Sequence, residues 1–392
     1  MQIIHYKYKE LLLRNELILI FFFFTLSYAL IVGYMAPYLY EIFNLSASAV
    51  GFISLGKSIS FFIASYLLSP FLLKYHEKKV LYISIISLIL ILVLTPSINQ
   101  LTYFIVFVIL IMIFTSFRTI SFNILYRDSL NEDSLVSKQG ILFSFFNTAF
   151  FISIFLGSAV ISSFDVSSIF YLSAIFLGIG FILLLNVEFK EITREEENQT
   201  SLKDSFRHAK TFFKNEFHRN LYFVSSGIHL YWASTSFFII LILQEGFSSS
   251  QVGLIFSLCY ISLILNEYHA SKLTQKYSFK TLFLIGYSIT ILSLFLAFLS
   301  PSLYFQIGFF ILASLGYSFI EPTREILFFK KTSSVNEEKF YPIQASCNFF
   351  GLILGFLLFS IFFLIPAIQD YFLLLVSGIL SLFVYFIFKI KD

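Results

Sequence analysis

Long apolar segments recur along the whole 392-residue chain and constrain its fold more than any other feature. Hydrophobic residues make up 58% of the chain and charged residues only 12%, against roughly 25% charged in soluble domains. A helix needs about 20 mostly apolar residues to cross the hydrocarbon core of a bilayer. Segments of this kind are predicted at residues 16–40, 48–71, 80–97, 101–126, 139–163, 166–187, 220–244, 251–271, 280–299, 302–327, 342–366 and 369–388. The sequence therefore predicts an all-α membrane protein with twelve transmembrane helices.

Basic residues mark one side of the predicted spans. The chain has 26 lysines and arginines. All of them except Lys57 and Arg118 are assigned to the two termini and to the connections after every second span. Because cytoplasmic loops are enriched in Lys and Arg, both termini are predicted to be cytoplasmic. The net charge of +3 arises from these loops and does not indicate nucleic-acid binding.

The connection at residues 188–219 divides the predicted spans into two sets of six. After an acidic run, apolar residues recur there at spacings of three and four among lysines and arginines, a pattern typical of an amphipathic helix. These residues are Leu202, Phe206, Ala209, Phe213 and Phe217. We predict that this helix lies on the inner membrane surface and links domains at residues 1–187 and 220–392.

The two sets of spans are related by an internal repeat. When the chain is shifted by 202 residues, positions 46–78 align with 248–280 without a gap, and 12 of the 33 positions are identical. The matches keep S-x-V-G-x-I at one end and K-Y-x-x-K at the other. This repeat predicts two pseudo-symmetric six-helix bundles related by an axis along the membrane normal.

Twelve spans in two sets of six, a long central connection and basic connections after spans two and eight resemble the major facilitator superfamily. The segment Gly316–Arg324, with Pro322, resembles the glycine-led tenth span of that family. The stretch Pro70–Lys79 keeps the basic end of the family's signature loop but lacks its glycines, aspartate and arginine. The fifth span retains only Leu156-Gly157-Ser158 of the glycine-proline motif common in drug antiporters. The resemblance implies alternating access around a central site, with the third, sixth, ninth and twelfth spans at the periphery.

Ionisable residues inside predicted spans are the first candidates for a functional site, because such residues are costly in a bilayer. The candidates for substrate binding or coupling are Lys57, Arg118, His229, Glu267 and Glu321. Lys57 lies roughly 14 Å deep at 1.5 Å per residue, close to the membrane centre. We therefore expect its side chain to face the bundle together with Ser54, Ser58 and Phe61.

Structural roles remain open for each of these residues. Lys57 can form an ion pair across the two halves, and Arg118 can extend its side chain to the cytoplasmic surface. Glu321 and Arg324 are three residues apart, so a local pair is sufficient to explain both. Glu267 and Glu321 also fit a cytoplasmic gate, and His229 can simply be packed.

Two further sets of candidates follow from position along the spans. Residues predicted to line a pathway are Tyr34, Tyr231, Trp232, Asn147 and Asn348. Residues predicted in cytoplasmic gate loops are Lys74, Lys78, Lys276, Lys280 and Arg324. Cys259 and Cys347 both fall in spans, which argues against a disulfide framework or a metal cluster.

The sequence predicts a secondary active transporter rather than an enzyme. We expect proton-coupled export of an anionic, zwitterionic or amphipathic solute, because the first half carries Lys57 and Arg118 where exporters of lipophilic cations carry carboxylates. The alternatives are proton-coupled uptake or exchange of an organic anion, a membrane sensor without transport, and a lipid-modifying membrane enzyme. Scattered histidines and short outer loops argue against the enzyme.

No cofactor is expected, and a proton gradient is the predicted energy source. The expected partners are a small-molecule substrate and the lipid bilayer, with no nucleic acid, and the chain is expected to be a monomer. Short loops and heavy use of Ile, Phe, Lys and Asn predict the plasma membrane of a prokaryote.

Overall fold

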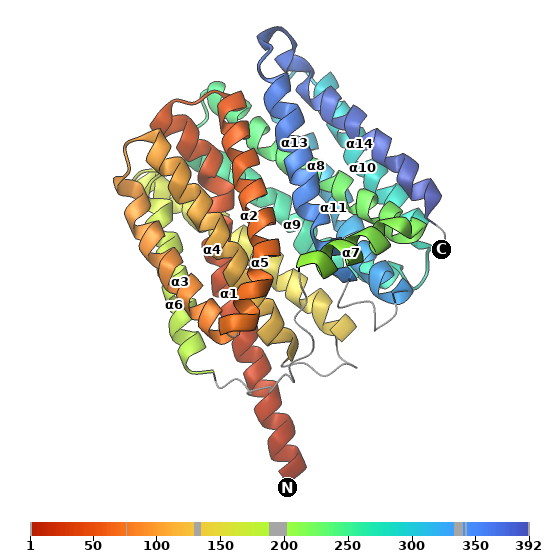
Figure 1. Cartoon of the computed structure of the whole chain (residues 1–392). Helices are drawn as coiled ribbons and strands as arrows, with labels where there is room; N and C mark the ends of the chain where they lie inside the picture. The colour runs from red at the N-terminus through yellow and green to blue at the C-terminus, as the bar shows by residue number, and fades with distance from the viewer. Residues whose placement is uncertain are drawn as a thin grey trace. The chain divides into compact units, whose positions relative to one another are not determined.

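The computed structural model describes residues 2–75, 77–128, 135–187, 202–332, 340–341 and 343–390, and their regular structure is entirely helical (Figure 1). Side chains are described for these residues except 2–15, 66–75, 127–128, 135–143, 202–206 and 268. Twelve described helical segments are long and apolar enough to cross a membrane, and each predicted span falls on one of them. The predicted fold class is confirmed, while the cytoplasmic placement of the termini stays a prediction.

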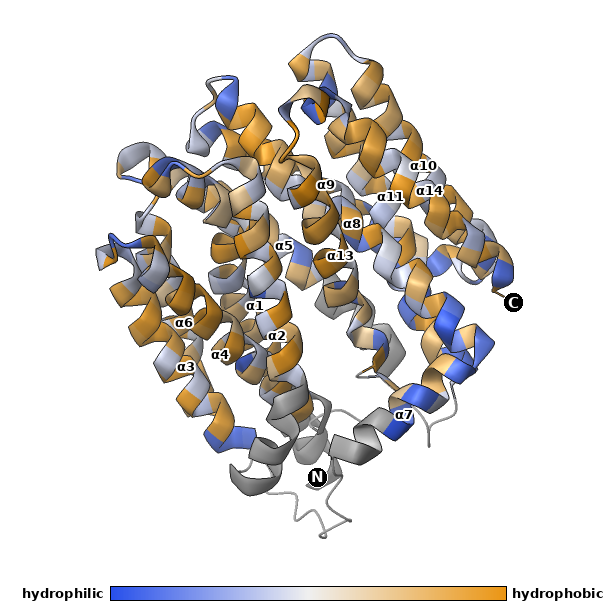
Figure 2. Cartoon of the chain, turned by 45° about the horizontal axis from the view of Figure 1, so that its top comes forward, coloured by the Kyte–Doolittle hydropathy of each residue, from blue (hydrophilic) through white to orange (hydrophobic). Residues whose placement is uncertain are grey.

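The long helices keep the predicted order. They are α1 (Gln2–Phe43), α2 (Ala47–Tyr75), α3 (Glu77–Leu94), α4 (Leu101–Asp128), α5 (Leu135–Ser163), α6 (Ser168–Leu185), α8 (Glu216–Gln244), α9 (Ser249–Leu273), α10 (Phe279–Leu299), α11 (Leu303–Lys331), α13 (Cys347–Phe362) and α14 (Phe372–Lys389). The shorter elements are η1 (Thr95–Ser97), α7 (Leu202–Lys214) and η3 (Pro366–Tyr371). Figure 2 shows hydrophobic residues along the long helices and hydrophilic residues on α7 and in the connections.

The chain forms two compact units. The first comprises Met1–Phe43, Gly56–Glu197 and Ser249–Leu254, and the second comprises Asn44–Leu55, Asn198–Ser248 and Ile255–Asp392. In the first unit α1 packs against α5 and α6, and α3 packs against α4. In the second unit α8 packs against α13, and α10 packs against α11 and α14. The predicted domain limits at residues 187 and 220 stay a prediction.

Aromatic side chains fix α7 in place. Phe212 is fully buried, and its ring lies 5.1 Å from that of His218, 5.6 Å from that of Phe340 and 6.2 Å from that of Tyr222. This segment is therefore a helix with one face packed against other parts of the second unit, and Phe217 of the predicted pattern lies in α8. Its predicted location on the membrane surface stays a prediction.

Two hydrogen bonds between serines follow the internal repeat. In the second unit the Ser48 hydroxyl donates to the Ser360 carbonyl at 2.8 Å. In the first unit the Ser250 hydroxyl donates to the Ser158 carbonyl at 3.0 Å. Positions 48 and 250 are 202 residues apart, as are positions 158 and 360. The repeat that was visible in the sequence thus extends to matching contacts within each unit.

Candidate functional site

A buried cluster of charged residues lies on α11 in the second unit. Arg324 is only 3% exposed, and its Nη2 lies 2.5 Å from Oε1 of Glu321, which confirms the predicted local pair. The same nitrogen lies 3.8 Å from Oε1 of Glu325, which is also buried. The three residues share one helix face because positions three and four apart are neighbours on a helix surface.

Helices α8 and α13 complete the surroundings of Arg324. Its Nη1 donates to Oδ1 of Asn348 at 2.6 Å and to Sγ of Cys347 at 3.1 Å, and it lies 3.5 Å from Nε2 of His229. One guanidinium therefore contacts side chains from three helices. Arg324, His229 and Cys347 are buried, and Asn348 is half-buried.

Glycines on α13 bring these helices close enough for the contacts. A Cβ at Gly351 would overlap the Ser226 carbonyl oxygen and lie 2.8 Å from Cβ of His229 on α8. A Cβ at Gly355 would lie 2.5 Å from Cβ of Ala233. Small residues at such spacing let helix backbones approach closely inside membranes. This approach places Asn348, one turn before Gly351, beside His229.

The cluster contains more acidic than basic charge. Among the described residues, the buried atoms Glu321 Oε2 and Glu325 Oε2 have no hydrogen-bond partner. Two ionised carboxylates against one guanidinium would leave excess negative charge in a site where charge is costly. One proton shared by the pair would neutralise the cluster.

Tyr341 borders the cluster just before the span that contains α13. The carboxylate of Glu325, followed by burial, raises the pKa of the Tyr341 phenol. The phenol therefore stays neutral and keeps its proton as a donor beside Glu325.

Aromatic residues extend the cluster along α8 and α11. The ring of Tyr317 lies 5.8 Å from that of His229 and 5.5 Å from that of Trp232. Trp232 in turn stacks on Tyr260 of α9 at 5.3 Å. Glu267, also on α9, is buried and within electrostatic range of Tyr317. The structure thus gathers His229, Glu321, Arg324, Trp232 and Asn348 in one region, with Glu267 at its edge.

Lys57 lies on α2, in the part of that helix that belongs to the first unit. Ser54, Ser58 and Phe61 are buried as predicted, whereas Ile63 is 50% exposed about 120° around the helix from Lys57. Lys57 itself is half-buried. In the part of the chain that is described, its ammonium forms no hydrogen bond or ion pair.

The remaining pathway candidates are buried. Tyr34 donates its hydroxyl proton to the Ile154 carbonyl at 2.6 Å, and Tyr231 donates to the Phe310 carbonyl at 2.9 Å. Asn147 is buried in α5. Arg118 is buried in α4, where its Nη1 donates to the Phe24 carbonyl at 3.3 Å.

The predicted gate residues do not form one group. Lys78 and Lys276 are exposed, Lys280 lies over the ring of Phe388 at 5.1 Å, and the side chain of Lys74 lies outside the described residues. The prediction that Arg324 lies in a loop is wrong, because Arg324 lies within α11, which continues to Lys331.

Glu325 was missed as a candidate, since only Glu267 and Glu321 were counted as acids within the inner half of the spans. The signal was present in the sequence, because Glu325 follows Glu321 by four residues and Arg324 by one. The predicted span of residues 302–327 already includes Glu325, and α11 continues past it to Lys331.

Comparisons with known proteins agree with this architecture. The nucleoside transporter NupG has a similar solved structure with a TM-score of 0.75 at 16% identity, covering 97% of this chain and 99% of the other. A POT family transporter in complex with a thioalcohol-conjugated peptide gives 0.78 at 12% identity, covering 97% and 96%. A bacterial homolog of the human lysosomal transporter Spinster gives 0.65 at 13% identity, covering 98% of each chain.

At these identities the structures share the fold alone. No curated protein sequence matches this chain. The family-level comparison matches the Major Facilitator Superfamily over residues 17–333, which is most of the chain. The chain therefore belongs to the Major Facilitator Superfamily of membrane transporters.

Proposed function

We propose that this protein is a proton-coupled secondary active transporter that exports an anionic, zwitterionic or amphipathic organic compound. The observation that carries the proton coupling is the Arg324 guanidinium shared by the Glu321 and Glu325 carboxylates inside α11. An imbalance of one acid in a membrane-spanning helix gives a group that binds and releases a single proton. Alternating access would expose that group to each side of the membrane in turn.

Lys57 supports the proposed charge of the substrate. Its ammonium has no hydrogen bond or ion pair within the described residues, and the neighbouring Ser54 and Ser58 are buried. A carboxylate or phosphate on the substrate would supply the missing opposite charge. Export, rather than uptake or exchange, rests on the resemblance of the span pattern to efflux-type members of the family.

The substrate class is tested by thermal unfolding of the purified protein at several pH values. The probes are benzoate as an anion, 5-aminolevulinic acid as a zwitterion, uridine as a neutral solute and tetraphenylphosphonium as a lipophilic cation. The zwitterion is chosen because a POT family transporter of this fold, 12% identical with a TM-score of 0.78, was solved in complex with 5-aminolevulinic acid.

Wild type, Lys57→Gln and Lys78→Gln are measured side by side. Lys78 is an exposed lysine and serves as the matched control. We expect an acid-bearing probe to stabilise wild type and Lys78→Gln but not Lys57→Gln. If tetraphenylphosphonium stabilises wild type and Lys57→Gln equally, Lys57 has a structural role and the proposed substrate class is wrong.

Proton coupling is tested in proteoliposomes loaded with the stabilising probe. An inward proton gradient should accelerate release of the probe from wild type, and Glu325→Gln should remove that acceleration. If the rate of release from wild type is the same with and without the proton gradient, the proposed coupling is wrong. If the gradient accelerates entry of the probe instead of its release, the protein is an importer.

A further inference from the structure

The first unit contains a buried arginine whose charge is not balanced by a carboxylate. Arg118 is 6% exposed and lies on α4, with its guanidinium 5.4 Å from the centre of the Phe24 ring. Among the residues that the structure describes, its hydrogen-bond acceptor is the Phe24 carbonyl at 3.3 Å, and it forms no ion pair. A charge this deeply buried is costly unless an opposite charge lies beside it.

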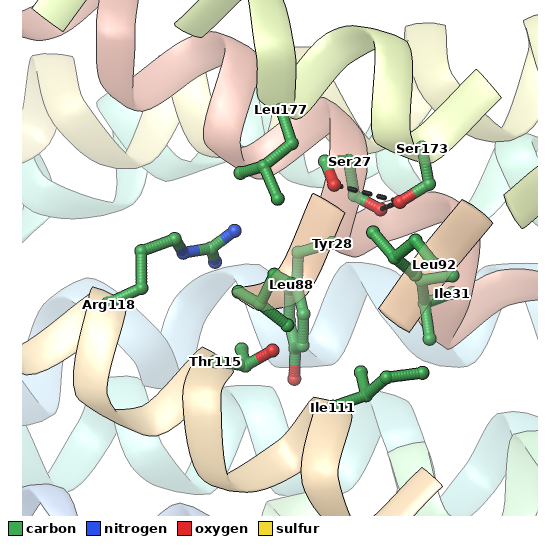
Figure 3. A pocket seen from close by; sticks show the side chains of 10 residues that line it. All are labelled: Ser27, Tyr28, Ile31, Leu88, Leu92, Ile111, Thr115, Arg118, Ser173 and Leu177. Carbon is green, nitrogen blue, oxygen red and sulfur yellow. Dashed lines mark hydrogen bonds between the residues drawn. The ribbon is translucent and has the colours of Figure 1, made fainter. Parts of the chain in front are cut away.

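The Arg118 side chain lines a small cavity between α1, α3, α4 and α6 (Figure 3). The volume of this cavity is about 10 Å³, enough for a single small particle. Figure 3 shows Arg118 extending from α4 toward the middle of the cavity, with Thr115 one turn earlier on the same helix and Tyr28 of α1 across it.

The polar side chains that line this cavity can donate hydrogen bonds, and none of them is a carboxylate. Within the described residues, the hydroxyls of Thr115 and Tyr28 have no hydrogen-bond partner. The hydroxyls of Ser27 and Ser173 lie 2.8 Å apart and form a hydrogen bond with each other. A guanidinium and two uncommitted hydroxyls therefore surround a space that contains no carboxylate.

The second unit shows how this chain balances the other arginine buried in its spans. Helices α4 and α11 are equivalent in the repeat, and each carries a buried arginine, Arg118 and Arg324 respectively. On α11, Glu321 and Glu325 flank Arg324. On α4, the positions three residues before and one residue after Arg118 are Thr115 and Thr119, which supply no charge. The negative charge beside Arg118 must therefore come from outside the described side chains.

We propose that this cavity binds a monatomic anion, chloride in a physiological medium, between Arg118, Thr115 and Tyr28. A halide accepts hydrogen bonds without donating them, which matches the donors that line the cavity. The small volume favours a single atom over an organic carboxylate or a phosphate. This site is distinct from the proposed substrate contact at Lys57, and it does not depend on the proposed transport reaction.

The test compares thermal unfolding of purified wild-type protein in sodium chloride, sodium bromide and sodium gluconate at equal ionic strength and pH. We expect saturable stabilisation by chloride and bromide but not by gluconate, which is too large for the cavity. Crystals grown in bromide should show an anomalous peak beside the Arg118 guanidinium. A wild-type protein that unfolds at the same temperature in all three salts would overturn the proposal, as a water molecule would then fill the cavity equally in each.

Variants separate this site from general salt effects. Arg118→Gln should unfold at the same temperature in chloride and gluconate, and Thr115→Val should need a several-fold higher chloride concentration for half of the stabilisation. Lys57→Gln should keep the full response. If Arg118→Gln does not fold, Thr115→Val and Tyr28→Phe decide the matter, and an unchanged chloride response in both would exclude the site.

Discussion

At the scale of single residues, the charged cluster on α11 depends on Arg324. This side chain is the one cation within 4 Å of Glu321 and Glu325 among the described residues, and it also contacts Asn348 and Cys347 on α13. Removing it leaves two buried carboxylates facing each other without compensation. Removing Glu325 instead leaves a neutral pair of Arg324 and Glu321.

Arg324→Gln is therefore expected to destabilise the protein by roughly 3 to 5 kcal/mol, the usual cost of breaking a buried pair by deleting one partner. Glu325→Gln should cost less than Arg324→Gln, because it removes the surplus charge. Thermal unfolding at neutral pH measures both, with Lys78→Gln as an exposed control. Equal unfolding temperatures for Arg324→Gln and Lys78→Gln would contradict the assigned electrostatics.

At the scale of helices, the packing of α13 on α8 positions the cluster. Gly351 has no room for a side chain, since its Cβ would overlap a backbone oxygen of α8. Gly378 on α14 offers a matched comparison, because a Cβ there would meet no atom within 4 Å. Because both residues lie within helices, replacing either one by alanine removes the same backbone freedom from the unfolded chain.

The two glycine substitutions should have opposite effects. Gly378→Ala should stabilise the protein by about 0.4 to 1 kcal/mol through the unfolded state. Gly351→Ala should destabilise it, because α13 must move away from α8 and carry Asn348 with it. Thermal unfolding of the two variants checks the sign, and a stable Gly351→Ala variant would show that the helices separate at little cost.

At the scale of the whole molecule, the sequence predicts an orientation in the membrane that the fold leaves open. The native cysteines, Cys259 and Cys347, are both buried and give little background in labelling. Asn99, before α4, and Lys276, after α9, are both exposed and lie on opposite predicted sides of the membrane.

We expect a membrane-impermeant maleimide to label Asn99→Cys in intact cells and to label Lys276→Cys only after the cells are opened. The reason is the enrichment of lysine and arginine in cytoplasmic loops. Labelling of Lys276→Cys alone in intact cells would reverse the predicted orientation. Neither substitution touches the candidate site.

Much of the architecture was predictable because it depends on local properties. The twelve spans follow from apolar length, and the pair of Glu321 and Arg324 follows from helix geometry. The burial of Ser54 and Ser58 follows from the small, weakly polar face that they form on α2, while the inward direction of Lys57 stays a prediction. Glu325 was predictable in the same way, because it lies inside the predicted span of residues 302–327 and directly after Arg324.

The sequence by itself determined that the chain lies in a lipid bilayer, how many helices cross it, and that the two halves repeat. These features depend on apolar length and on the 3.6-residue helix period, which can be judged within one segment at a time. Only the tertiary structure decided that His229 and Asn348 meet Arg324, and that Thr115 and Tyr28 share a cavity with Arg118. These groups come from separate helices, and their distances depend on how closely the backbones approach. That approach is set at positions such as Gly351, whose partner helix cannot be read from the residues beside it.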